Sequence, residues 1–228
     1  MTPLPAGSTN VFARALGWPH PASATLPALV AALADPRWRD VTLGRVRAGG
    51  VDRLFCVNAG TGLDAETVHL VEARPWIKTR FRHAGFATMT VAAALRATAR
   101  ASRIACAVDG GAAEIFAAVV AACGAPYAYF GRRPLDLVPG ADFGPRLRWI
   151  GLRSAGLGTV GTVVGGALRG GRHVERDAVA SGWAEREIVL RSGPPVAVQA
   201  DGEPLGRHVE IRLGPGPVLR TLRPPPGR

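Results

Sequence analysis

Two acidic side chains, Asp201 and Glu203, follow the apolar segment 196–200 in the sequence Val-Gln-Ala-Asp-Gly-Glu-Pro. Asp-Gly after an apolar strand is a common hairpin signal, and such a turn needs no chemical role. Two carboxylates on a turn can also stand at the edge of a cleft, where one of them could accept the proton of an attacking alcohol. The segment therefore predicts a β-turn that carries a candidate general base.

A second polar segment, residues 58–66, reads Asn-Ala-Gly-Thr-Gly-Leu-Asp-Ala-Glu and is expected to form a loop between a strand and a helix. The loop could present Asp64 and Glu66 to a polar headgroup. Asp64 could instead cap the helix expected near 66–72, because Asp is a preferred N-cap residue.

The third candidate is the turn Pro-Ala-Gly-Ser-Thr-Asn at residues 5–10. Gly7 lets the backbone approach a ligand, Ser8 and Thr9 can donate hydrogen bonds, and the N–H groups of a following helix favour a phosphate. An ordinary capped helix explains the same residues, because Ser and Thr are preferred caps.

Other chemistries are not supported by the sequence. The five histidines lack metal-ligand spacing, and the three cysteines form no CxxC pair, so neither zinc nor a disulfide framework is indicated. There is no Walker A motif. The cysteines lie in apolar runs and are expected to pack as small hydrophobic residues in a reducing cytoplasm.

The chain of 228 residues has a net charge of +11, almost all of its basic residues being arginine. This charge is not gathered into a stripe interleaved with aromatic residues, as in proteins that bind single-stranded nucleic acid, so no nucleic-acid partner is expected. A basic surface also attracts anionic lipid headgroups and ATP.

The helices and strands that must position these residues are distributed unevenly: the first 36 residues are expected to be mostly helical, and the rest of the chain mostly strands. Short helices are expected at 11–16 and 26–34, with later helices at 66–72 and 86–101. The remaining segments read as strands, apart from a Gly-rich stretch at 159–168 that could be helix or loop. The expected strands are 40–46, 53–57, 103–108, 114–122, 135–139, 147–152, 187–190, 196–200 and 208–213.

This outline predicts an α+β fold. Residues 1–36 are expected to be the last unit of a larger α/β domain, and 37–207 a mostly antiparallel β domain. Residues 208–228 form a final strand and tail that could return to the first domain. A remnant of this kind is expected to expose apolar side chains of Phe12, Leu16, Leu26 and Leu29. No signal peptide is visible, and the apolar stretch 115–130 is too short to span a bilayer.

Taken in order, the three polar segments resemble the diacylglycerol kinase catalytic-domain family, which includes bacterial lipid kinases and the sphingosine kinases. Residues 4–17, Leu-Pro-Ala-Gly-Ser-Thr-Asn-Val-Phe-Ala-Arg-Ala-Leu-Gly, resemble the family's LPxGTxNDFARxLG stretch. Residues 55–65 are similar to its FxNxAGxGxDA segment, and residues 198–205 to its DGE turn. The resemblance covers essentially the whole chain.

The resemblance implies an ATP-dependent lipid kinase in which residues 1–36 are the C-terminal remnant of an α/β nucleotide-binding domain and 37–207 a β-sandwich domain. The lipid would bind between the two domains, and Mg²⁺ would neutralise phosphate charge. The implied nucleotide contacts are Gly7, Ser8, Thr9 and Asn10. Glu203, with Asp201 beside it, would take the place of the general base. Asn58, Asp64 and Glu66 would line the lipid headgroup region, and Asp142 falls where some members bind a structural magnesium ion. The implied substrate is a lipid alcohol such as diacylglycerol.

The sequence departs from the family pattern in three places. No Gly-Gly-Asp-Gly-Thr phosphate loop occurs in it, Val11 replaces the usual Asp, and Pro145 with Arg146 replaces the Asp-Gly that follows Asp142. The leading hypothesis is therefore a cytoplasmic, peripherally membrane-associated lipid kinase that is incomplete in these 228 residues, with homodimer formation left open. The alternatives are a non-catalytic lipid- or partner-binding module, and a basic nucleic-acid-binding β domain.

Overall fold

The computed structural model describes residues 1–4, 10–19, 21–72, 103–130 and 133–226, so the helix expected at 86–101 lies outside it. The helices described are α1 (Val11–Ala15), α2 (Ala22–Ala34), α3 (Leu63–Glu72) and α6 (Leu157–Ala167), with a 3-10 helix η1 (Arg172–Glu175). The strands described are β1 (Trp38–Ala48), β2 (Val51–Phe55), β3 (Asn58–Gly62), β4 (Ile104–Val108), β5 (Glu114–Phe116), β6 (Ala118–Ala122), β7 (Ala128–Phe130), β8 (Arg133–Leu135), β9 (Leu147–Leu152), β10 (Val179–Ala184), β11 (Ile188–Ala200) and β12 (Glu203–Leu222). The predicted α+β class with a mostly antiparallel sheet is confirmed.

The main sheet runs in the order β10-β9-β6-β3-β11-β12-β1-β2, and β4 and β5 branch from β11. β11 pairs with β3 through Val198–Ala200 and with β4 through Ile188–Ser192. Between these stretches its register with β12 shifts around Pro194 and Pro195, which have no N–H to donate. Two separate strands were expected here, and that expectation is wrong: β11 is one long strand that serves two parts of the sheet.

The core is built by strands that are apolar on both faces. Val119 and Ala121 of β6 pack in the larger hydrophobic cluster, while Val120 and Ala122 pack in a second cluster beneath α6. Because side chains alternate along a strand, this period-2 division places β6 between two buried layers. The Gly-rich stretch at 159–168, expected to be helix or loop, falls largely within helix α6. This helix covers the second face of the sheet.

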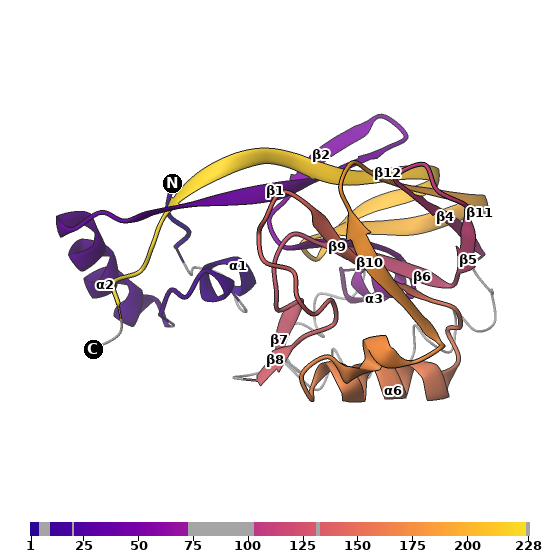
Figure 1. The fold of residues 1–228 in the computed structure, drawn as a ribbon, viewed down its shortest axis with the longest axis horizontal. Coiled ribbons are helices and arrows are strands. Elements are labelled where there is room, and N and C mark those ends of the chain that lie inside the picture. The colour runs from indigo at the N-terminus through magenta and orange to yellow at the C-terminus, as the bar shows by residue number, and fades with distance from the viewer. Residues whose placement is uncertain (5–9, 20, 73–102, 131–132, 227–228) are drawn as a thin grey trace.

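β1 and β12 connect the β domain to a small lobe that holds α1 and α2, where Met1 and the C-terminal end of β12 also lie (Figure 1). Their antiparallel register runs from Trp38↔Leu222 to Arg47↔Arg212. β12 is continuous from residue 203 to 222, so it passes the predicted boundary at residue 207 without a break. Its far end lies in the small lobe.

Helix α2 carries no charged side chain. Thr25 and Ala32 are buried, whereas Leu26, Val30 and Leu33 are 57%, 69% and 61% exposed. Their spacing of four and three residues places these three on one face of the helix. A helix that is apolar on all sides is usually buried in protein, so this face is unusual for a solvent-exposed surface.

The other apolar side chains expected at this surface behave differently. Leu16 is buried in the core cluster, so its predicted exposure is wrong. Phe12 and Leu29 are partly buried against the same cluster. The Phe12 ring meets Phe143 edge to face at 5.7 Å between centroids, which fixes α1 against the β domain.

The segment at 58–62 is a buried strand, β3, and the predicted loop is wrong. β3 lies between β6 and β11 in the sheet. Its glycines allow close packing, because a Cβ on Gly62 would overlap the Ala117 carbonyl and one on Gly60 would overlap the Asp64 carboxyl. Glycine is uncommon within strands, and here it marks close approach by neighbouring groups.

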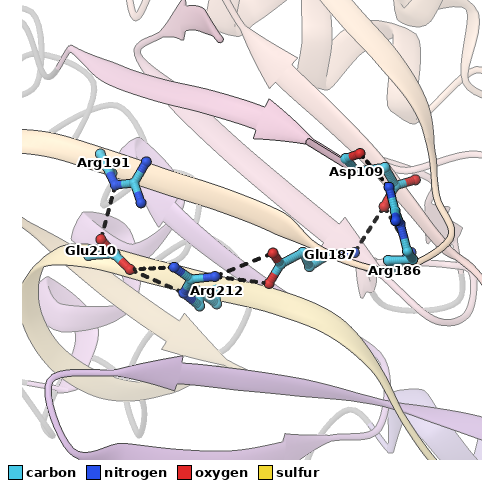
Figure 2. A network of polar contacts seen from close by, with 6 residues as sticks. All are labelled: Asp109, Arg186, Glu187, Arg191, Glu210 and Arg212. Carbon is cyan, nitrogen blue, oxygen red and sulfur yellow. Dashed lines mark hydrogen bonds and ion pairs between the residues drawn. The ribbon is translucent and has the colours of Figure 1, made fainter. Parts of the chain in front are cut away.

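A row of alternating charges crosses β11 and β12 (Figure 2). Arg191 pairs with Glu210 at 3.0 Å, and Arg212 pairs with both Glu210 and Glu187. At the end of this row, Arg186 Nη2 donates to the carbonyl of Asp109. Cross-strand pairs of opposite charge favour this register of the two strands.

Candidate active site

The Asp201–Gly202 turn joins β11 to β12, with Ala200 paired to Glu203. Both central residues have positive φ angles, 48° and 82°. This is the backbone that a two-residue hairpin of type I′ requires and that Asp-Gly favours, so the predicted turn is confirmed. The turn also carries both acids proposed for catalysis.

Asp201 anchors the turn to the segment that precedes β3. Its carboxyl accepts hydrogen bonds from the backbone N–H groups of Cys56 (2.5 Å), Val57 (2.8 Å) and Asn58 (3.1 Å). Its own N–H donates to the carbonyl of Asn58 at 2.8 Å. Burial of the carboxyl raises the pKa of Asp201, and the three N–H donors oppose that rise. The carboxyl is thereby committed to holding two motif segments together.

Glu203 has a different environment. Its side chain is 67% exposed, and Arg53 Nη2 of β2 lies 2.8 Å from its Oε2. An exposed ion pair of this kind is weak and easily exchanged. Of the two acids on the turn, Glu203 is the one whose carboxylate is not engaged by the backbone N–H groups of residues 56–58, so it is the more available to a ligand.

A buried polar network lies beside the turn. The carboxyl of Asp64, in the first turn of α3, accepts a hydrogen bond from the Tyr127 hydroxyl and one of 2.7 Å from Gln199 Nε2. Gln199 Nε2 also lies 3.1 Å from Asn58 Oδ1, and Gln199 Oε1 accepts the Gly202 N–H at 2.9 Å. Burial raises the pKa of Asp64, and the hydrogen bonds from Tyr127 and Gln199 act against it.

Glu66 lies two residues further along α3 than Asp64, and its side chain is 22% exposed. Its carboxylate forms an ion pair with Arg207 of β12, 2.7 Å from Nη1. The Asn58 side chain has a second partner, because its Nδ2 donates to the Tyr127 carbonyl at 3.1 Å. The two polar segments, about 140 residues apart in sequence, therefore meet in one region through β3, α3 and the β11–β12 turn.

Four residues in this region were not expected from the sequence: Arg53, Tyr127, Gln199 and Arg207. Gln199 offered the clearest signal, since it is a single polar residue within the apolar strand 196–200 and is fully buried. Buried polar side chains need partners, so its position predicts a hydrogen-bond network. Tyr127 and the two arginines had no comparable signal, because their partners are distant in sequence.

The surroundings of Asp142 do not fit a magnesium ion. One carboxyl oxygen accepts the Gly144 N–H at 2.9 Å, and Arg39 Nη2 donates to the Asp142 carbonyl at 2.9 Å. Mg²⁺ requires several oxygen ligands, and a guanidinium beside them repels it. Within the described ranges no cluster of three or more His, Cys, Asp or Glu side chains could hold a metal. No hydrogen bond found there links Asp142 to the site.

Of the expected nucleotide contacts, Gly7, Ser8 and Thr9 lie outside the described residues. Asn10 is described and directly precedes α1, with a left-handed φ of 49°. None of the helices in the described part of the chain has the length and apolar character needed to cross a bilayer.

The arrangement of strands matches solved structures. A diacylglycerol kinase from Bacillus anthracis str. Sterne superposes with a TM-score of 0.57 at 13% identity, covering 97% of this chain and 66% of its own. Two candidate diacylglycerol kinases from the same strain give TM-scores of 0.68 and 0.64 at 18% and 14% identity. This chain has the diacylglycerol kinase fold.

The likeness has limits of extent and of sequence. The two candidate kinases are matched over 97% and 96% of this chain, and over 67% and 68% of their own lengths. This chain therefore spans about two thirds of the length of each of the three solved structures. No protein-family model matches the sequence, and no curated protein matches it. At this identity the shared property is the fold.

Proposed function

We propose that this protein acts as an ATP-dependent lipid kinase, with a lipid alcohol such as diacylglycerol as acceptor. The observation that supports this most is the meeting of the 58–66 segment and the Asp201–Glu203 turn, held by the three N–H bonds to Asp201. These are the segments through which the sequence resembles lipid kinases, and the fold likeness agrees with them.

In the proposed reaction, the lipid hydroxyl oxygen forms a bond to the γ-phosphorus of ATP while the bond to the β–γ bridging oxygen breaks. ADP leaves with that bond's electron pair. Glu203 accepts the hydroxyl proton, which makes the attacking oxygen a better nucleophile. Phosphoryl transfer depends mainly on positioning and charge neutralisation, so the anchored turn would contribute by fixing where Glu203 stands.

The headgroup contacts are proposed to come from the Asn58–Glu66 segment. Glu66 is the acid of this segment proposed to contact the headgroup directly, because its carboxylate is partly exposed and pairs with the more exposed Arg207. Asp64 is less suited to touch the lipid directly, because Tyr127 and Gln199 occupy its carboxyl. The lipid would be met at a membrane surface on the cytoplasmic side.

ATP enters this proposal as a substrate. The Gly7–Asn10 turn would contribute contacts to its phosphates, and Mg²⁺ would arrive bound to ATP. The Asp142 loop has no part in the proposed mechanism, because its surroundings hold an arginine where a cation would need oxygen ligands.

The test is transfer of labelled γ-phosphate from ATP to diacylglycerol in phospholipid vesicles by the purified protein. Glu203→Gln should lower the rate by roughly 10²- to 10⁴-fold, the usual contribution of a general base. Glu210→Gln on the same strand is the matched control, since Glu210 lies in the ion-pair row away from the turn. Equal rates for wild type and Glu203→Gln would remove Glu203 from the reaction.

A second candidate function is lipid binding without turnover. It is favoured by the lack of a Gly-Gly-Asp-Gly-Thr sequence in these 228 residues. This alternative predicts that the protein sediments with diacylglycerol-containing vesicles while no labelled phospholipid forms. Phosphorylated product in the same samples would exclude it.

A further inference from the structure

Asp64 differs from Glu203 and Glu66 because its carboxyl accepts hydrogen bonds from two neighbouring side chains and forms no ion pair with an arginine among the described contacts. The Tyr127 hydroxyl donates to Oδ1 and Gln199 Nε2 donates to Oδ2. The backbone of β3 lies close behind the carboxyl, since a Cβ on Gly60 would overlap Oδ2. The carboxyl group therefore has protein groups on three sides, and each of its two oxygens already has a hydrogen-bond donor.

The acceptors around Gln199 determine how its amide is turned. Nε2 faces two oxygen acceptors, Asp64 Oδ2 and Asn58 Oδ1. An amide has donors only on its nitrogen, so with Nε2 in this place Oε1 must point the other way. It then meets the Gly202 N–H at 2.9 Å. If the amide were reversed, Oε1 would face Asp64 Oδ2 and Asn58 Oδ1, and the NH₂ group would face the Gly202 N–H. None of these pairs can form a hydrogen bond.

Gly202 lies between the two acids of the turn. Asp201 before it anchors residues 56–58, and Glu203 after it carries the proposed base. We propose that Asp64 is a positioning residue: it orients Gln199, and Gln199 holds the turn that places Glu203. This assignment rests on the proposed kinase function for its catalytic consequence, whereas the link from Asp64 to Gly202 stands independently of it.

The proposal distinguishes two substitutions at one position. Asn at 64 can offer its oxygen to Gln199 Nε2 and its NH₂ to the Tyr127 hydroxyl oxygen, because a hydroxyl can accept as well as donate. Asp64→Asn should therefore keep the orientation of Gln199. Asp64→Ala removes the acceptor and leaves Gln199 Nε2 with Asn58 alone. A residue needed for its charge, such as a headgroup ligand, would lose function in both variants.

The first readout is amide hydrogen exchange of the full chain, which requires no catalytic activity. Asp64→Ala should speed exchange of the Gly202 amide by about tenfold, the effect of losing one hydrogen bond. Asp64→Asn should leave it within about threefold of wild type. Asp136→Ala is the matched control, since Asp136 is another partly buried aspartate with a raised pKa and lies beside α6. Unchanged Gly202 exchange in Asp64→Ala would overturn the proposal.

The second readout is lipid phosphorylation. Asp64→Ala should lower kcat by at least about tenfold with KM for diacylglycerol unchanged, and Asp64→Asn should retain most of kcat. A rise in KM with kcat unchanged, or equal losses in both variants, would assign Asp64 to substrate binding and reject positioning. If the wild type shows no kinase activity, the proposed function fails while the exchange result still decides the role of Asp64. Should Asp64→Ala not fold, Gln199→Met removes the same bond to Gly202 and must reproduce the faster exchange.

Discussion

Arg53 and Glu203 form an ion pair of 2.8 Å between β2 and the start of β12, and both side chains are more than half exposed. Exposed pairs contribute about 0–1 kcal/mol to stability. We therefore expect Arg53→Leu to change the free energy of unfolding by less than about 0.5 kcal/mol, as measured by urea denaturation. A loss above about 2 kcal/mol would show that the pair holds the turn, and that Glu203 substitutions perturb structure as well as chemistry.

Asp201→Asn should destabilise the protein. Asn retains the left-handed backbone of this position but offers one oxygen where the carboxyl offers two, so its NH₂ would face a backbone N–H. We expect a loss of about 1–3 kcal/mol in urea denaturation, the cost of leaving a partly buried backbone N–H unpaired. Asp177→Asn at an exposed position is the control and should stay within about 0.5 kcal/mol of wild type.

Gly60→Ala and Gly161→Ala should have opposite effects on stability. A Cβ at position 60 overlaps the Asp64 carboxyl in the packed core, and overpacking costs about 1–3 kcal/mol. At position 161, in α6, nothing lies within 4 Å of the added Cβ. Ala is the better helix former there by roughly 0.5–1 kcal/mol. Thermal melts of the two variants check the prediction, and destabilisation by Gly161→Ala would contradict it.

Asp109 should make stability depend on pH. Burial raises its pKa, but the backbone N–H groups of Glu185, Arg186 and Glu187 outweigh burial, so the pKa is lowered. A lowered pKa in the folded state adds stability above the unfolded value, near 3.9, and that stability is lost as pH falls through the folded pKa.

Asp109→Asn should accordingly reduce the free energy of unfolding at pH 7, and the gap to wild type should narrow at pH 3. Asn tolerates the positive φ of 52° at this position, so the variant tests the carboxylate rather than the backbone. If the difference in free energy of unfolding between wild type and Asp109→Asn instead widens as the pH falls, the Asp109 carboxylate does not stabilise the folded state.

Local signals in the sequence predicted the elements that depend on neighbouring residues. The Asp201–Gly202 turn follows from its turn residues, and a short helix at α1 was expected at 11–16. The strand expected at 135–139 is wrong, since only Arg133–Leu135 pairs, with β7. The strand expected at 114–122 is divided into β5 and β6.

The site itself was only partly predictable. Its acids were recognised by type, yet β3 was mistaken for a loop because its glycines are explained only by what packs against them. The separate roles of Asp201 and Glu203 depend on which backbone each carboxyl meets after β11 and β3 pair. The periodicity of apolar residues carries no information on such long-range contacts. Gln199, a polar residue within an apolar strand, is the one local signal of the buried network.

The pairing of Trp38 with Leu222 has a consequence for how this fold can be rearranged. The chain enters the β domain along β1 and leaves it along β12, and these two strands are paired. The segment from residue 38 to residue 222 therefore begins and ends at neighbouring positions. This segment could therefore be inserted into a surface turn of another protein whose two flanking residues lie close together. The Leu222 N–H also bonds to the Met1 carbonyl, so a short linker could join the end of β12 to Met1, and new termini could be opened at the Gly49–Gly50 turn.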